Sequence, residues 1–239
     1  MMINRSWTQA RWEFALLMRN GEQVLLMIVI PIVLLLAMRF GPQMLVDALP
    51  PESVIPTVAS VSVMAGCFTS LAIATAFERR SGALRFMATT PLRVRELLAG
   101  KLLAAAGVTG VSLAVVVVVG VLLGWPLGTL SGTAIIGLVV TVILGCLAWA
   151  ALALLVAGAL RAEAVLALAN GVFVLALVFG GILNPTDRMG VLGDVIRFTP
   201  SAALADGLRE PGITSLVILI VWTAVAGTLA SMTFRWEDR

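Results

Sequence analysis

Charged side chains are densest in one segment of the chain, FERRSGALRFMATTPLRVRELLAGK, residues 77–101. This charged segment holds six of the sixteen basic residues, together with Glu78 and Glu96. Guanidinium, ammonium and carboxylate groups at this density are suited to binding, because they form ion pairs with a partner protein or with anionic lipid headgroups. Long uncharged runs lie on both sides, so the charges make a polar platform in an apolar sequence. The residues alone leave both kinds of binding open.

The sequence contains no recognisable catalytic motif. The chain has no histidine, which removes the commonest general base and metal ligand. Gly100 and Lys101 do not belong to a phosphate-binding loop, since that motif needs Gly where Arg95 stands and Ser or Thr where Leu102 stands. The two cysteines, Cys67 and Cys146, lie in separate apolar runs and are expected to be small apolar residues. We expect no enzyme activity, and no cofactor or metal bound by this chain.

The elements that position the charged segment are apolar runs. The chain is 60% hydrophobic and only 12% charged, whereas soluble domains are about a quarter charged. A helix needs about 20 apolar residues to cross a bilayer, and runs of this kind must be helical in lipid. The sequence therefore predicts a single-domain, all-α integral membrane protein over residues 1–239 with six transmembrane helices, at 24–38, 54–77, 102–123, 134–160, 164–183 and 213–234. A signal peptide is a weak alternative for the first run, since polar and charged residues precede it without a typical cleavage site.

Lysine and arginine counts predict the orientation. The N-terminal segment, the charged segment, the loop at Arg161 and the C-terminal tail carry twelve of the basic residues, whereas the alternate loops carry four. Cytoplasmic loops are the more basic ones. We therefore expect a cell inner (plasma) membrane protein with both termini in the cytoplasm. Basic residues that flank apolar runs also argue against nucleic acid as a partner.

Three further segments lie outside the predicted spans. Residues 5–20 form an amphipathic interfacial helix, in which Trp7, Phe14, Leu17 and Met18 follow helical spacing while Glu13 falls off that face. Residues 78–96 form a cytoplasmic helical platform, with Thr90 and Pro91 at its break. Residues 185–212 mix apolar and charged side chains and favour short re-entrant helices on the outer side. No predicted span contains an internal ionisable residue, which disfavours an ion-coupled transporter.

The order of these segments resembles the membrane subunit of bacterial ABC-2 type transporters. The charged segment is similar to that family's cytoplasmic loop, with a Gly-x-Leu step and a Thr-Pro-Leu turn before the third helix. NPTDRMGVLGDVIRFTPSAALADGLRE, residues 184–210, is similar to the stretch before its last helix. The resemblance implies an exporter permease that pairs with a second copy or a paralogue. It also implies two separate ATPase subunits that bind ATP and Mg²⁺.

Residue roles follow from this resemblance. Residues of the charged segment would form the coupling helix that contacts the ATPase, with Leu84 or Met87 filling an apolar pocket: Glu78, Arg79, Arg80, Gly82, Leu84, Arg85, Met87 and Pro91. The N-terminal helix would be the connecting helix, through Trp7, Arg11 and Phe14. The second and fifth helices would line the substrate path, through Phe68, Phe173 and Phe179. The segment before the last helix would form an outer lid, through Pro185, Pro200 and Arg209.

The uncharged spans favour a hydrophobic or amphiphilic substrate, such as a drug or a lipid. The absence of histidine and of paired carboxylates within the spans disfavours an intramembrane enzyme. A non-transporting membrane scaffold that docks a cytoplasmic partner is the alternative that the sequence leaves open.

Overall fold

The structure, a computed structural model, describes residues 2–19, 21–43, 49–89, 94–126 and 131–233, and within these ranges it contains helices and no strand. The all-α prediction is thus confirmed for the described residues. In chain order the helices are α1 (Met2–Arg19), α2 (Gly21–Phe40), α4 (Pro51–Met64), the π-helix η1 (Ala65–Ser70), α5 (Leu71–Arg80), α6 (Ala83–Ala88), α7 (Val94–Leu122), α8 (Gly132–Ala159), α9 (Ala162–Phe179), the 3₁₀-helix η2 (Thr186–Met189), α10 (Val191–Ile196), α11 (Pro200–Arg209) and α12 (Ile213–Thr233).

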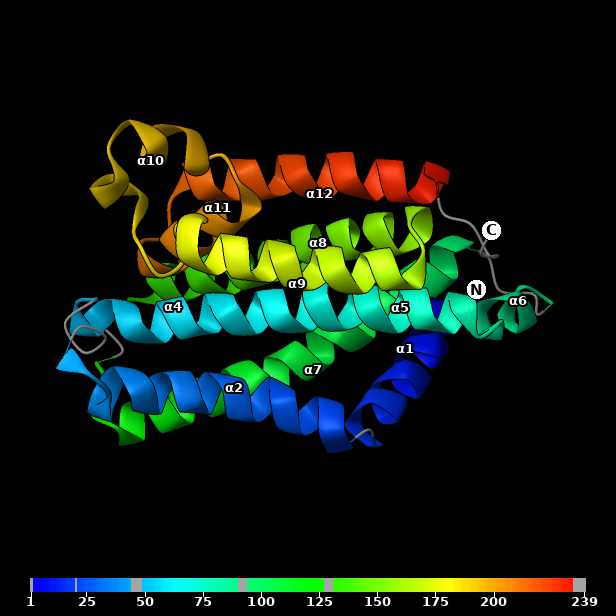
Figure 1. Cartoon of the computed structure of the whole chain (residues 1–239), viewed down its shortest axis with the longest axis horizontal. Helices are drawn as coiled ribbons and strands as arrows, with labels where there is room; N and C mark the ends of the chain where they lie inside the picture. Colours follow the sequence, from blue (N-terminus) through cyan, green and yellow to red (C-terminus); the bar gives the residue numbers. More distant parts are fainter. Residues whose placement is uncertain (1, 20, 44–48, 90–93, 127–130, 234–239) are drawn as a thin grey trace.

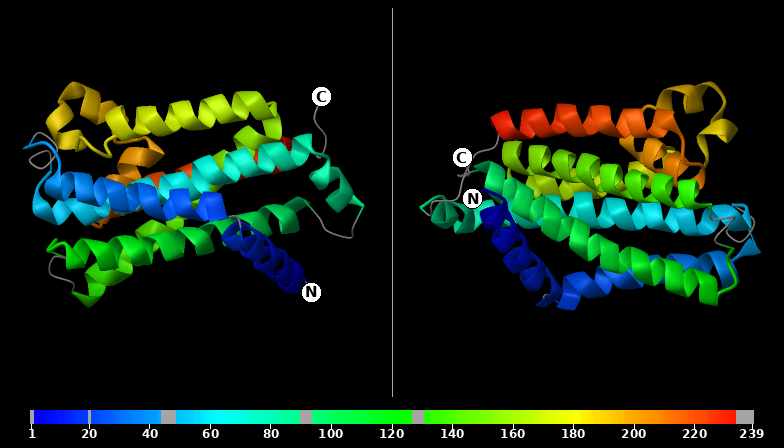
Figure 2. Two further views of the ribbon diagram at one scale, coloured as in Figure 1. Left: turned by 60° about the horizontal axis from the view of Figure 1, so that its bottom comes forward. Right: turned by 180° about the vertical axis from the view of Figure 1, so that it is seen from behind.

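The long helices form an elongated bundle with two distinct ends (Figure 1). At one end, which we call the α6 end, lie α6, the beginning of α1 and the end of α12. At the other, which we call the α10 end, lie α10, the beginning of α4 and the end of α2. Helix α1 slants across the α6 end and diverges from the direction of the other long helices (Figure 2).

Helices α4, η1 and α5 form one continuous rod over Pro51–Arg80. Proline occupies the first position of α4, where its missing N–H costs no helical hydrogen bond. The π-helical turn in the middle of the rod places an extra residue in the helix, a feature that is frequent at functional sites. The rod extends three residues beyond each end of the predicted span at 54–77 and carries Glu78, Arg79 and Arg80 on its last turn.

Helix α8 lies at the centre and packs against α5, η1, α11 and α12. Its buried face is rich in alanine and glycine, including Ala148, Ala153 and Gly145. A methyl group added at Gly145 would approach Leu204 Cδ1 to 2.5 Å. Small side chains thus let neighbouring helices approach α8 closely, which is how helices associate in lipid.

Large apolar side chains cover much of the outer surface of the bundle. Examples are Val118 on α7, Leu175 on α9 and Val221 on α12, each more than half exposed. A surface of this kind is unstable in water and is suited to lipid. The chain is therefore a multi-pass membrane protein.

Five helices in the described ranges are long and apolar enough to span a bilayer: Pro51–Arg80, Glu96–Leu122, Gly132–Ala159, Ala162–Phe179 and Ile213–Thr233. The predicted first crossing falls in α2, whose apolar part within the described side chains, Met27–Phe40, is shorter than a span. The predicted span at 164–183 ends early, at Phe179. Its continuation is broken by Gly180 and by Gly181, whose φ of 79° is left-handed.

Candidate functional site

The charged segment begins at the end of α5 and continues through a sharp reversal of the chain into α6, at the α6 end of the bundle (Figure 1). Helix α5 ends at Arg80, and the Ser81 N–H still donates to the Phe77 carbonyl at 2.9 Å. Gly82 follows in the left-handed conformation, with φ of 78°. Glycine adopts this conformation without the steric cost of a side chain. The chain therefore reverses sharply at Gly82 and begins α6.

Helix α6 has one face turned to the protein and one turned outward. Leu84 is fully buried, and half-buried Met87 accepts a hydrogen bond at its Sδ from Gln9 Nε2 of α1 at 3.9 Å. Phe86 points the other way and is 76% exposed. The predicted apolar face of α6 thus packs on the chain itself, because a short helix next to a bundle gains most by burying that face. Leu84 is not available to a partner in this structure, and Phe86 is the exposed apolar group instead.

Arg79 connects the charged segment to the central helix. Its side chain is 5% exposed and donates to the carbonyl of Gly158 at 2.8 Å and to that of Leu160. These carbonyls lie at the C-terminus of α8, where intrahelical donors are lacking and the helix dipole is negative. The predicted role of Arg79 as an outward contact is therefore wrong for this structure, because the end of α8 binds its guanidinium group.

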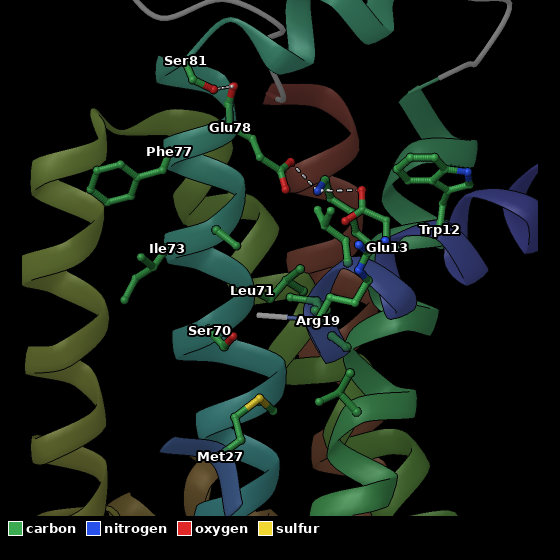
Figure 3. Close-up of a pocket in the computed structure, with 17 residues that line it drawn as sticks. Trp12, Glu13, Arg19, Met27, Ser70, Leu71, Ile73, Phe77, Glu78 and Ser81 are labelled. Carbon is green, nitrogen blue, oxygen red and sulfur yellow. Dashed lines mark hydrogen bonds and ion pairs between the residues drawn. The ribbon is translucent and has the colours of Figure 1, made fainter. Parts of the chain in front are cut away.

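Lys101 forms the centre of a buried ionic cluster. Its side chain is 2% exposed, and its Nζ lies 2.9 Å from Glu13 Oε1 and 2.5 Å from Glu78 Oε2 (Figure 3). Glu13 belongs to α1, Glu78 to α5 and Lys101 to α7, so the cluster joins three helices. Burying a charge is costly unless it is paired, and here one ammonium group is shared by two carboxylates. Glu13, predicted to lie off the apolar face of α1, is nevertheless buried, at 7% exposed, because Lys101 pairs with it.

A cavity of about 1080 Å³ opens next to this ionic cluster, between α1, α2, α5 and α7. Figure 3 shows Glu78, Glu13 and Phe77 nearest Ser81, Arg19 and Leu71 further down, and Met27 at the far end. Trp12, Phe77 and Arg19 line it together with the ionic cluster, and Leu71 and Met27 line its apolar part. Two residues of the π-helix, Gly66 and Ser70, also form part of its wall. A cavity with charged groups next to apolar walls is suited to an amphiphilic ligand.

The N-terminal helix α1 packs on α7 and leaves an aromatic and basic face outside. Phe14 packs on α7, where a methyl group added at Gly107 would approach Phe14 Cδ2 to 3.1 Å. Trp7 is 57% and Trp12 71% exposed, and Arg11 is exposed as well. The three residues predicted for a connecting helix therefore do not act together: Phe14 faces the protein, whereas Trp7 and Arg11 face outward.

Of the remaining predicted coupling residues, the structure describes the side chain of Arg80 but not that of Arg85 or Pro91. Exposed Arg80 pairs with exposed Glu163 at the start of α9, with 2.6 Å between Nη1 and Oε1. An exposed pair of this kind contributes little to stability, about 0–1 kcal/mol. Pro91 and the side chain of Arg85 lie outside the described part of the chain.

A second cavity, of about 420 Å³, is lined almost wholly by apolar side chains from α8, α9, α12 and the segment before α12. Phe68 of the π-helix and Phe179 both line it, whereas Phe173 does not and instead packs against the hydrophobic core. Phe68 also contacts Trp149 of α8, with ring centroids 5.1 Å apart. The structure thus brings together two of the three residues predicted for a substrate path.

The segment predicted to form an outer lid contains η2, α10 and α11 at the α10 end of the bundle. Pro185 precedes η2, and Pro200 begins α11, where Thr199 Oγ1 accepts from the Ala202 N–H at 3.4 Å. Arg209 ends α11. Its guanidinium donates to the carbonyls of Gly181 (2.9 Å) and Ile182, and to Thr57 Oγ1 at 3.1 Å.

Asp206 completes this cluster, 3.1 Å from Arg209 Nη1. Burial raises the pKa of Asp206 above its ordinary value, although hydrogen bonds from Thr186 and Arg209 act in the opposite direction. Burial likewise lowers the pKa of Arg209. The cluster ties the end of α9 to α4 and α11.

Sequence reasoning did not assign a role to Lys101 or to Phe86. Lys101 was visible only as one more basic residue, because nothing local in the sequence relates it to Glu13. A signal for Phe86 was present, since it lies off the face that Ala83, Leu84 and Met87 share on α6.

The fold and the site together define a class: a multi-pass helical membrane protein with a charged segment at one end. Residues 50–232 match the family model described as ABC-2 family transporter protein. The chain belongs to this family, and it is a membrane permease component. It is not itself catalytic. A comparison with curated proteins gives no match.

Proposed function

We propose that the chain is the permease subunit of an ATP-binding cassette exporter, driven by ATPase subunits on separate chains. The family supports this proposal, because ABC transporters in general work with ATPase partners. The observation that carries it is the geometry of α6. This helix presents an exposed phenylalanine at one end of the bundle, and its neighbours on α5 are anchored in the interior.

In this proposal α6 is the coupling helix, and Phe86 is its central apolar contact with the ATPase. A few buried aromatic anchors usually provide most of the energy of an interface. Exposed Arg80 would lie at the rim of this interface. Rim charges act mainly on the association rate and its salt dependence. Leu84 and Met87 hold α6 against the bundle, which is a supporting role.

Force on α6 would travel along two connections. Through α5 and Arg79 it reaches the end of α8, and through Glu78 and Lys101 it reaches α7 and α1. ATP binding would close the two ATPase subunits and favour one of two arrangements of these helices. Transport is then a shift between two populations that differ in their affinity for the closed ATPase.

The complex would contain two permease subunits and two ATPase subunits. Six crossings are proposed, with α2 as the first and both termini on the cytoplasmic side, in the cell inner (plasma) membrane. Helix α1 lies at the inner interface, where exposed Trp7 and Trp12 suit headgroup depth. The segment 185–212 covers the outer side. An impermeant thiol reagent should reach a cysteine at Asp187 but not one at Ser81 in intact cells, in a background without Cys67 and Cys146; the reverse pattern overturns the orientation.

The cargo is hydrophobic or amphiphilic, a drug or a lipid. The second cavity, with Phe68 and Phe179 in its wall, supports a path next to the π-helix. Substitutions at these two positions should change substrate preference while the complex still assembles. Unchanged transport by both variants contradicts the assignment.

Co-purification tests the central proposal. The tagged full-length chain, isolated from its native membrane, should retain an ATPase in stoichiometric amount, and Phe86→Ala should release it. A non-transporting scaffold is the alternative function, and it predicts a retained partner without substrate-stimulated ATP hydrolysis. The complete absence of an ATPase overturns the exporter proposal.

A further inference from the structure

The large cavity at the α6 end has a distinctive order of charges along its length. Nearest the bundle end lies the ionic cluster, in which two carboxylates share one ammonium group. The formal charge of this cluster is therefore negative by one unit. Glu78 keeps part of its side chain accessible, at 22%, so the excess negative charge faces the cavity.

Arg19 supplies a positive charge deeper in the same cavity. Figure 3 shows its side chain below Glu13 and Glu78, at the level of Leu71. The residue is exposed, and among the side chains that the structure describes none forms an ion pair with it. An exposed guanidinium at the edge of an apolar cavity is a binding group for phosphate, which it contacts with two N–H donors.

Apolar side chains line the cavity from Ile73, past the level of Leu71 and Arg19, down to Met27. Leu71, Ile73 and Ala74 of α5 form one wall, and Met27, Ala105 and Val108 of α2 and α7 form the other. Trp12 and Phe77 lie at the charged end, and both are exposed. Aromatic rings at that depth suit the boundary between headgroups and acyl chains, and their faces attract ammonium groups.

We propose that this cavity binds a phospholipid whose headgroup carries a primary amine, such as phosphatidylethanolamine. In such a lipid the ammonium is outermost, the phosphate follows and the acyl chain lies deepest. The cavity presents the complementary order: carboxylates with aromatic rings, then Arg19, with apolar walls beside it and beyond it as far as Met27. The lipid comes from the leaflet at the α6 end.

Other lipid headgroups match the cavity less well. Phosphatidylglycerol has the phosphate but no cation, and so leaves the excess carboxylate charge unpaired. An uncharged amphiphile leaves both Arg19 and the excess carboxylate charge without a partner. The inference goes beyond the proposed exporter function, because it concerns this chain alone and needs no ATPase.

Lipid binding to the purified full chain in detergent tests this proposal. Phosphatidylethanolamine, phosphatidylglycerol and N-acetylated phosphatidylethanolamine are titrated separately, and native mass spectrometry counts the bound lipids. We expect phosphatidylethanolamine to bind about fivefold more tightly than the other two, the effect of roughly one charge contact near a lipid headgroup. Equal affinity for all three lipids overturns the proposal.

Two matched pairs of variants locate the site. Arg19→Gln should weaken phosphatidylethanolamine binding about fivefold, whereas Arg11→Gln should not, because Arg11 lies on α1 outside this cavity.

Ala74→Trp fills the apolar part of the cavity and should abolish binding of the tightly held lipid. Its control is Ala15→Trp, on the exposed face of α1. Loss of binding in the controls as well, or in neither member of a pair, contradicts this location; size-exclusion profiles verify that each variant is folded.

Discussion

The two ends of the bundle both use a largely buried arginine to bind backbone carbonyls at a helix end or just beyond it. At the α6 end Arg79 binds the carbonyls at the end of α8, and at the α10 end Arg209 binds those of Gly181 and Ile182 after α9. The guanidinium group suits this task, because it offers several donors in a fixed plane.

The surroundings of the two arginines differ. Arg209 has Asp206 one helical turn away and Thr57 beside it, so its cluster is compact. The α6 end adds a second cluster around Lys101, with a cavity of about 1080 Å³ next to it. A compact cluster keeps elements in one arrangement, whereas ion pairs next to open space can rearrange. In the proposed function, the α10 end is a rigid cap and the α6 end is the joint that the ATPase moves.

Lys101→Met should have the largest effect of the substitutions considered. It leaves Glu13 and Glu78 close together in the interior without their cation. Breaking a buried ion pair by removing one partner costs about 3–5 kcal/mol. We expect a strongly reduced yield and a lower melting temperature, measured by fluorescence-detected size-exclusion chromatography after heating.

The control for this variant neutralises the whole cluster. Combining Lys101→Met with Glu13→Gln and Glu78→Gln removes all three charges, so no unpaired charge remains. Replacing a buried ionic network in full is often close to neutral for stability. A single Lys101→Met variant as stable as the unmodified protein contradicts the buried cluster.

This cluster also shows where sequence reasoning stops. The apolar runs predicted five helices that the structure has, because twenty apolar residues in lipid permit little else. The periodicity of residues 5–20 predicted a helix, which the structure has as α1, but it gave no sign that Glu13 is buried. Helical spacing orders residues within one helix only, and the burial of Glu13 depends on a lysine in another helix.

In helix α6, too, the sequence predicts the pattern within one helix but not its contacts with other helices. The sequence correctly predicted an apolar face through Leu84 and Met87, but it could not say what covers that face. The sharp reversal at Gly82 turns it toward the bundle and leaves Phe86 outside. Among the predicted outer residues, Arg209 lies largely buried in a hydrogen-bond cluster, for which the sequence carries no local signal.

Leu84→Ala and Phe86→Ala form a matched pair with opposite expectations. Leu84→Ala removes a fully buried side chain and should cost about 2–5 kcal/mol of stability. Phe86→Ala should leave the melting temperature unchanged and weaken ATPase binding about thirtyfold, or ~2 kcal/mol. Thermal melts and pull-down with the ATPase measure the two effects. If the Phe86→Ala variant keeps full ATPase retention and coupling, Phe86 is not the contact with the ATPase.

Arg79→Lys and Arg209→Lys test the contrast between joint and cap. A lysine cannot reproduce the two directed hydrogen bonds to carbonyls, so each variant should lose about 1–2 kcal/mol of stability. Only Arg79→Lys should also reduce substrate-stimulated ATP hydrolysis, because it alone lies between α6 and α8. Equal loss of coupling in both variants removes the distinction between the two ends.

Asp206→Asn should have the smallest effect, and its sign follows from the pKa. Burial raises the pKa of Asp206, so the folded protein binds this proton more tightly than the unfolded chain does. Stability from this group is therefore complete below the ordinary aspartate pKa of about 3.9. It is lost as pH rises through the higher folded-state pKa.

Asparagine carries no charge at any pH, so the variant should lack this part of the pH dependence. At neutral pH its stability should differ from that of the unmodified protein by less than about 1 kcal/mol, since Arg209 keeps its carbonyl acceptors. Melting temperatures of both proteins between pH 4 and neutrality, roughly the range of a carboxylate shifted by burial, measure the difference. A larger loss at neutral pH than in Arg209→Lys would show that the Asp206 carboxylate, and not the carbonyl contacts of Arg209, holds the α10 end together.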